Sequence, residues 1–126
     1  AIIVLERENS LEFVRETGEK TNIELTKEIL ETIFFKNSPL HDGAIILKGN
    51  YIKATRVVLP VSESTSIPTR FGLRHRAGFG ITEKTDALAI VISEQRGKIS
   101  YIKNGEFYSF KNIDELRIRI TEDLLI

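Results

Sequence analysis

The stretch Ala87-Leu88-Ala89-Ile90-Val91-Ile92 is the longest uninterrupted apolar run in the chain. A strand that is apolar at every position has to be covered on both of its faces, and a run of this length suits a strand. It therefore predicts a central strand of a sheet that carries helices on either side. The run is far shorter than the roughly 20 residues that cross a bilayer, so it does not predict a membrane span.

Strand and helix patterns alternate on both sides of this run. Turn residues at Gly49-Asn50 and Asn104-Gly105 separate pairs of predicted strands, at 44–48 with 51–59 and at 98–103 with 106–110. A further strand is predicted over 2–6. One helix is predicted from Asn9 to Gly18, with Glu12 as the capping partner of Asn9, and a second is predicted to begin at Thr26. Two more helices are predicted over about 73–82 and over about 113–124, the last with Leu116, Ile120 and Leu124 on one face. This order predicts the α/β class, with one mixed β-sheet flanked by helices. With no repeat or linker, residues 1–126 are predicted to form a single domain.

Composition excludes several classes of protein. The 126 residues are 41% hydrophobic and 29% charged, which is a globular rather than a disordered composition. Lys+Arg and Asp+Glu are 18 each, so the zero net charge predicts no nucleic-acid partner. The absence of Cys excludes a disulfide framework and a thiolate nucleophile, and two His leave little material for a histidine metal cage.

The first residues, Ala1-Ile2-Ile3-Val4-Leu5, form an apolar run without an initial Met. The start of the chain does not have the form of a signal peptide, in which a charged region is followed by an apolar one. We expect this chain to be a domain cut from a longer protein, so that any membrane contact is made through a segment absent from this chain.

Four segments could carry chemistry. In Leu40-His41-Asp42-Gly43-Ala44 a carboxylate precedes an apolar strand, and the glycine beside it leaves room for a ligand. Ser93-Glu94-Gln95-Arg96-Gly97 follows the most buried strand, where ligands gather in α/β folds. Leu59-Pro60-Val61-Ser62-Glu63-Ser64 lies at a strand end and offers backbone groups that could read the edge of a base. An ordinary turn is the alternative interpretation of the first two segments.

The fourth segment is Gly72-Leu73-Arg74-His75-Arg76, at the start of a predicted helix. Three potentially cationic side chains in a row do not share one helix face, but at a helix start they add to its unpaired N–H groups and its dipole. This arrangement favours a polyphosphate site. The alternative is a basic helix start that pairs with surface carboxylates.

Together these segments suit a nucleoside triphosphate with a divalent metal, although the chain has neither a GxxxxGK[ST] loop nor a GxGxxG motif. The order His41-Asp42-Gly43-Ala44, Leu59-Pro60-Val61-Ser62, Arg74-His75-Arg76-Ala77 and Ser93-Glu94 resembles the diadenylate cyclase domain family, over essentially the whole chain. The membrane-tethered type is the most similar. The resemblance implies that two such domains face each other and join two ATP molecules into cyclic di-AMP, releasing two pyrophosphates, in a cytoplasmic domain of a membrane-anchored protein.

The resemblance also implies roles for individual residues. Asp42 would assist deprotonation of the attacking 3′-hydroxyl, directly or through a bound Mn²⁺ or Mg²⁺, with Co²⁺ as a third candidate. His41 and Gln95 would be further metal contacts, Arg74, His75 and Arg76 would hold the phosphates and serve catalysis, and the other ATP-binding residues would be Gly43, Ala44, Leu59, Ser93 and Glu94.

Two positions depart from the family pattern, which usually has Thr at the position of Leu73 and a second Glu at the position of Gln95. Loss of one charge-assisted contact costs about 1.5–3 kcal/mol, so we expect a slower or metal-selective enzyme. A nucleotide-binding module without catalysis is the alternative. A metal phosphohydrolase built on His41 and Asp42 ranks last, because it needs more ligands than the two His supply.

Overall fold

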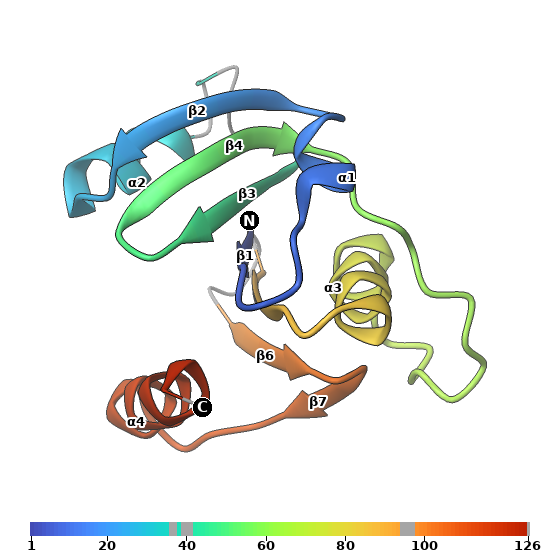
Figure 1. Cartoon of the computed structure of the whole chain (residues 1–126). Helices are drawn as coiled ribbons and strands as arrows, with labels where there is room; N and C mark the ends of the chain where they lie inside the picture. The colour runs from blue at the N-terminus through green and yellow to red at the C-terminus, as the bar shows by residue number, and fades with distance from the viewer. Residues whose placement is uncertain (36–37, 39–41, 94–97, 126) are drawn as a thin grey trace.

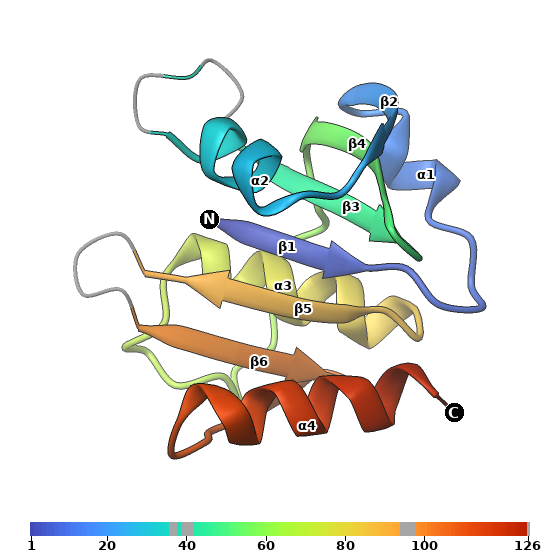
Figure 2. The same ribbon diagram turned by 90° about the vertical axis from the view of Figure 1, so that its left-hand side faces the viewer.

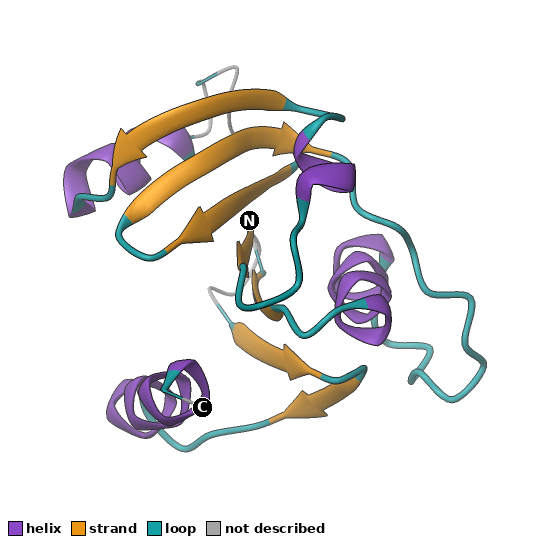
Figure 3. Ribbon diagram, in the orientation of Figure 1, coloured by secondary structure: helices purple, strands orange, loops and turns teal. Residues whose placement is uncertain are grey.

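One sheet of seven strands, in the order β2-β4-β3-β1-β5-β6-β7, runs through the computed structural model (Figure 1). The structure describes residues 1–35, 38, 42–93 and 98–125. The strands are β1 (Ile2–Leu5), β2 (Glu19–Glu24), β3 (Ala44–Lys48), β4 (Tyr51–Val57), β5 (Leu88–Ile92), β6 (Ile99–Lys103) and β7 (Glu106–Tyr108). The helices are α1 (Glu12–Arg15), α2 (Lys27–Ile33), α3 (Leu73–Lys84) and α4 (Ile113–Leu124), shown with the strands in Figure 3.

Strand β1 joins the two halves of the sheet. It pairs in parallel with β3, where Ile2 lies opposite Ala44, and antiparallel with β5, where Ile2 lies opposite Val91. All other strand pairs are antiparallel. The predicted α/β class with a mixed sheet is confirmed.

Side chains that point alternately to the two faces of the sheet divide the core into two parts. On β1, Ile2 and Val4 belong to a cluster that includes residues of α1 and α3, whereas Ile3 and Leu5 pack on the opposite side against residues of α2 and α4. Figure 2 shows α3 behind the sheet and α2 and α4 in front of it. Strand β5 is covered on both faces, as its apolar sequence predicts.

Helix α3 runs through Gly78 and Gly80 because both residues lie against neighbouring parts of the fold. A Cβ at Gly80 would lie 1.8 Å from the carbonyl oxygen of Pro60, and one at Gly78 would lie 2.8 Å from the Ile102 side chain. The two glycines therefore let α3 approach the 60–62 segment and β6 closely. Their low helix propensity is outweighed by this packing.

Strand β2 and the start of α1 differ from the sequence-based expectation. Strand β2 was not predicted, since the segment Glu19–Glu24 is mostly polar and pairs with β4 at the edge of the sheet through its backbone. The expected Asn9 cap is wrong, because Leu11 is the N-cap residue of the short α1. Asn9 instead exchanges hydrogen bonds of 3.0 Å with Asp86, which ties the β1–α1 loop to the start of the β5 region.

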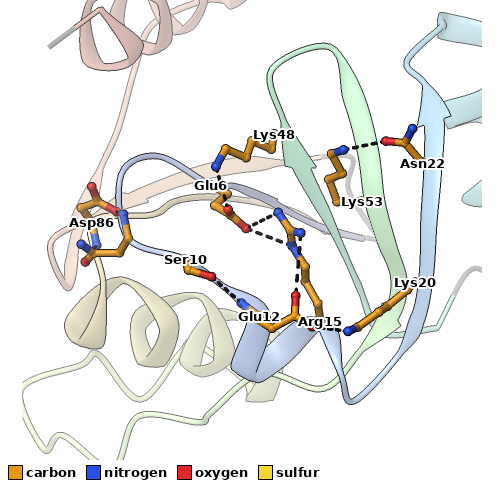
Figure 4. Close-up of polar contacts among 10 residues, drawn as sticks. Glu6, Ser10, Glu12, Arg15, Lys20, Asn22, Lys48, Lys53 and Asp86 are labelled. Carbon is orange, nitrogen blue, oxygen red and sulfur yellow. Dashed lines mark hydrogen bonds and ion pairs between the residues drawn. The ribbon is translucent and has the colours of Figure 1, made fainter.

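A buried carboxylate fixes the end of β1. The Glu6 side chain is only 2% exposed and accepts hydrogen bonds from Arg15 at 2.8 and 3.1 Å, while Lys48 lies 3.3 Å from its other oxygen (Figure 4). Because a buried carboxylate needs its charge compensated, this cluster holds β1, α1 and the end of β3 together.

Helix α4 covers β5 and β6 with a face that differs slightly from the expected one. Leu116 is buried, but Leu124 is 48% exposed and Asp123 takes the buried position near the end of the helix. Its carboxylate accepts hydrogen bonds from the Tyr101 hydroxyl at 2.6 Å and from Lys103 Nζ at 2.8 Å. Burial alone raises the pKa of Asp123, but these hydrogen bonds outweigh it and the pKa lies below its ordinary 3.8.

Of the described helices, none combines the length and the apolar character needed to span a bilayer.

We expect Asp123→Asn to lower the free energy of unfolding at pH 7 by about 1–3 kcal/mol, because Lys103 loses a charged partner. The depressed pKa means that the carboxylate stabilises the fold above about pH 4 and ceases to do so as the pH falls through the folded-state pKa. Urea unfolding at pH 7 and at pH 3 measures both effects, and the variant should lose less stability on acidification than the wild type.

Asp114→Asn is the matched control, since Asp114 is 82% exposed on the same helix and pairs only loosely with Arg117, at 3.5 Å. It should change stability by less than about 1 kcal/mol. Equal destabilisation by the two substitutions would contradict the role given to Asp123.

Candidate functional site

The expected site segments meet at one end of the sheet. Ala44 at the start of β3 lies opposite both Ile2 of β1 and Val57 at the end of β4, and Ile2 also lies opposite Val91 near the end of β5. Residues that precede β3 or follow β4 and β5 therefore gather at this end, although they are up to about 50 positions apart in the chain.

Asp42 and Gly43 lead into β3 with an exposed backbone. Gly43 has a φ of +81°, and a Cβ at this residue would lie 2.9 Å from the backbone of Arg56. Glycine is therefore needed here both for the left-handed conformation and for the close approach of β4. Arg56 itself has a φ of 53° and lies at an irregularity in the β3–β4 pairing. The Asp42 side chain is exposed beside this junction.

Two adjoining hollows open at this end of the sheet. The first, which we call the β4 groove, has a volume of about 260 Å³ and is lined by Ile2, Gly43, Ala44, Val57, Val58, Leu59, Val61, Leu73, Arg74 and Ala77. The second, the β5 groove, has a volume of about 350 Å³ and is lined by Gly72, Leu73, Arg74, His75, Val91, Ile92 and Ser93. Leu73 and Arg74 line both, so the first turn of α3 forms the boundary between them.

The first turn of α3 presents backbone donors to these grooves. Gly72 is the N-cap residue, and among the described residues no side chain caps this end of the helix. The N–H groups of the first turn have no partner within the helix, and they carry the positive end of its dipole. Arg74 adds an exposed guanidinium at the same place. This turn is suited to binding an anion.

The His75 ring is fixed by its neighbours and is uncharged. Its Nε2 lies 3.0 Å from the Ser100 hydroxyl, and its ring stacks on Phe71 with centroids 4.5 Å apart. Burial, followed by the positive charges of Arg70 and the amino terminus, lowers the pKa of His75 from its usual 6.5. The imidazole is therefore neutral at pH 7 and can offer a hydrogen bond but not a full charge.

Arg76 points elsewhere. Its Nη1 donates to the carbonyl oxygens of Ser62 and Ser64 at 3.3 and 3.1 Å, and its own carbonyl accepts the Ser62 N–H at 2.9 Å. Successive helical residues point about 100° apart, so the Arg74 and Arg76 side chains leave α3 in different directions. In this structure Arg76 holds the 62–64 segment against α3 and lines neither groove.

The structure thus brings together Gly43, Ala44, Leu59, Arg74, His75 and Ser93, with Asp42 adjacent. The other expected site residues, His41, Glu94 and Gln95, lie outside the described residues. Within the described part of the chain, no three His, Cys, Asp or Glu side chains cluster as a metal site.

Several groove residues were not anticipated from the sequence. Val58 and Val61 line the β4 groove although they are 67% and 46% exposed, and Ser100 contacts His75 from β6. Val58 lies one position before Leu59 and Val61 two positions after it, so their place beside the groove could have been inferred. Nothing near Ser100 in the sequence signals its contact with a residue 25 positions away.

Comparison with known proteins identifies the family signature in this chain. A family model described as DisA bacterial checkpoint controller nucleotide-binding (DAC) matches residues 1–107. The chain is 44% identical over 109 residues to the diadenylate cyclase CdaS of Bacillus thuringiensis, covering 86% of this chain and 54% of that protein. The chain spans about half the length of the curated relatives it matches.

Solved structures are also similar. The crystal structure of a double mutant of DacA from Staphylococcus aureus superposes with a TM-score of 0.93 at 36% identity, covering 100% of this chain and 84% of that one. A protein described as a hypothetical membrane spanning protein from Bacillus cereus gives a TM-score of 0.84 at 43% identity, covering 89% of this chain and 55% of that one.

We expect Gly43→Ala to destabilise the protein more than Gly49→Ala. Both glycines have positive φ, but nothing lies within 4 Å of a Cβ at Gly49. Gly49→Ala should cost about 1–2 kcal/mol from conformation alone, and overpacking against Arg56 should add about 1–3 kcal/mol at Gly43. Urea unfolding measures the difference, and equal costs would show that β4 does not approach Gly43 closely.

The lowered pKa of His75 also predicts a pH dependence of stability. Because the unfolded chain binds a proton at His75 more readily, stability should fall as the pH drops below about 6.5, until the folded-state pKa is passed. Urea unfolding of the wild type and of His75→Gln between pH 7.5 and 5 isolates this effect as the difference between the two curves. A difference that does not change with pH would refute it.

Proposed function

Because this chain belongs to the DAC family of nucleotide-binding domains, we propose that it condenses two molecules of ATP into cyclic di-AMP and releases two pyrophosphates. The chain covers only part of its curated relatives, and the proposal concerns what this domain does.

One observation supports this proposal above the others. The Asp42-Gly43-Ala44 segment and the first turn of α3 border the same groove, although 30 residues separate them in the sequence. An acidic group beside the groove and an anion-binding helix start are the two parts that nucleotidyl transfer needs. The apolar walls formed by Val57, Val58 and Leu59 suit a base.

Asp42 is the proposed base. The 3′-hydroxyl oxygen of one ATP attacks the α-phosphorus of the other, and the bond from that phosphorus to the bridging oxygen of the β-phosphate breaks. The hydroxyl proton passes to Asp42, and pyrophosphate leaves with the electron pair of the broken bond. The 3′-hydroxyl of the second nucleotide then attacks the α-phosphorus of the first in the same way, which releases the second pyrophosphate and closes the ring. Each step is a positioned phosphoryl-type transfer in which the protein contributes orientation and charge rather than covalent chemistry.

The phosphates are assigned to the first turn of α3. Arg74 is exposed between the two grooves, where its guanidinium can pair with a phosphate together with the N–H groups of the helix start. His75 contributes a neutral hydrogen bond from the β5 groove. Arg76 acts indirectly, through the 62–64 segment that it holds.

Enzymes of this nucleotidyl-transfer type generally use a divalent metal ion. The described residues suit an ion held jointly with the substrate, since Mg²⁺ is commonly bound by one or two carboxylates plus phosphate oxygens, and Asp42 supplies an exposed carboxylate. His41 and Gln95 are the proposed further ligands, and Mn²⁺, Mg²⁺ or Co²⁺ the proposed ions. The bound ion would lower the pKa of the attacking hydroxyl and neutralise phosphate charge.

The proposed partners are ATP and a second copy of this domain. Each copy binds one ATP through residues that include Ser93 and Glu94. The two copies face each other so that the 3′-hydroxyl of each nucleotide can attack the α-phosphate of the other. We propose that the domain works in the cytoplasm, attached to a membrane through a segment outside this chain.

Incubation of the chain with ATP and Mg²⁺, Mn²⁺ or Co²⁺, followed by mass identification of products, tests the proposal. We expect cyclic di-AMP from the wild type, and a loss of at least about 100-fold in rate for Asp42→Asn and for Arg74→Ala, since each removes a group that acts on the reacting centre.

Asp114→Asn and Arg117→Ala are the matched controls, because they remove the same kinds of charge from the exposed face of α4. Both should keep wild-type rates. Unchanged product from Asp42→Asn and Arg74→Ala would overturn the proposed site, and ATP binding without product under every ion would favour a binding module without catalysis.

A further inference from the structure

The two nitrogens of the His75 ring have different surroundings. Nε2 lies 3.0 Å from the Ser100 hydroxyl, whereas Nδ1 has no hydrogen-bond partner among the described residues. Within that part of the chain, no buried side-chain nitrogen or oxygen lacks a partner. Nδ1 is therefore accessible to solvent, on a residue that lines the β5 groove beside Arg74 and Ser93.

The environment of Ser100 decides the direction of this hydrogen bond. Ser100 is 7% exposed, and its hydroxyl has no other hydrogen-bond partner among the described residues. If the hydroxyl accepted from Nε2–H, its own proton would have no acceptor among the described residues, which is costly on a residue that is only 7% exposed. If the hydroxyl donates to Nε2, every polar hydrogen is satisfied. The second arrangement places the ring proton on Nδ1, because a neutral imidazole carries only one.

Phe71 fixes the plane of the ring. It stacks on His75 with an interplanar angle of 11°, and it is packed in turn against Phe79 and Phe107 with centroids 6.0 and 5.1 Å away. The ring of His75 thus has a fixed plane, set by an aromatic neighbour, and a fixed edge, set by a hydroxyl.

We propose that Ser100 is a positioning residue: it donates its hydroxyl proton to Nε2 of His75 and so keeps a proton on Nδ1, which donates a hydrogen bond to a phosphate oxygen of the nucleotide in the β5 groove. This inference rests on the proposed nucleotide site. The opposite tautomer would present a lone pair to the phosphate and repel it. A neutral imidazole carries a single N–H donor, so Nδ1 can donate to a phosphate only if the ring proton lies on Nδ1. Burial keeps His75 neutral, and its tautomer therefore decides whether it can bind a phosphate oxygen.

Nitrogen-15 chemical shifts of the His75 ring at pH 8, in the chain without nucleotide, test the tautomer directly. His41→Gln identifies the His75 signals, since these are the two histidines of the chain. We expect the proton on Nδ1 in the wild type and a shift of population toward Nε2–H in Ser100→Ala. Protonation mainly at Nε2 in the wild type would overturn the proposal whatever the function of the domain.

Equilibrium titration with ATP tests the consequence. Ser100→Ala should bind ATP about two- to tenfold more weakly, as expected for loss of one ordinary hydrogen bond, and Ser100→Thr should restore affinity because it keeps the hydroxyl. Thr82→Ala is the matched control: it removes a buried hydroxyl from the other end of α3, where the contacts are with Gly78, Phe79 and Gly105. It should lower stability and leave ATP affinity unchanged.

The outcomes separate this inference from the proposed function. ATP binding with equal affinity by the wild type and Ser100→Ala would overturn the role of Ser100 and leave the nucleotide site standing. Weaker binding by Thr82→Ala of the same size would show a general effect of destabilisation and would also overturn it. Absence of ATP binding by the wild type would remove both, and the nitrogen-15 result would then describe only the fold.

Discussion

The pairing of β1 with strands on both sides is the constraint on which the rest of the structure depends. Without β1, the β2-β4-β3 and β5-β6-β7 units would be separate antiparallel sheets. The parallel β1–β3 pair places the start of β3 at the same end of the sheet as the end of β5. Both grooves open at that end, with Ile2 in the wall of one of them. The buried Glu6 cluster anchors β1 at the opposite end.

Much of the fold was predictable because its signals are local. The apolar run that includes β5, the glycine turns between strands and the helix patterns of α2 and α4 all depend on neighbouring residues. The exceptions depend on distant ones. Strand β2 forms because β4 offers a free edge, and Asn9 is not a cap because Asp86, 77 residues away, pairs with it. Asp123 takes a buried position because Tyr101 and Lys103 provide its partners.

In the site too, the features that depend on neighbouring residues were predictable from the sequence and those that depend on distant residues were not. Its segments could be found in sequence because each joins a chemically unusual residue to a turn or helix start, and resemblance to a family gave them an order. The different roles of Arg74 and Arg76 follow from helix geometry and from the carbonyl groups of Ser62 and Ser64, which the motif does not reveal. The contact of Ser100 with His75 requires β6 to lie beside α3. Sequence indicates the chemistry available, and packing decides which atoms are presented.

The close approach of Gly80 to Pro60 has a consequence for binding. The connection between β4 and α3 is held to the helix at two points: Pro60 packs against Gly80, and the carbonyl groups of Ser62 and Ser64 accept hydrogen bonds from Arg76. Leu59 and Val61 on one side and the α3 start on the other are therefore held to the same helix. A ligand that touches both meets a receptor that is already ordered, and little of its interaction energy is spent on freezing loops. Such a receptor discriminates by shape, because it adapts poorly to a ligand of different length.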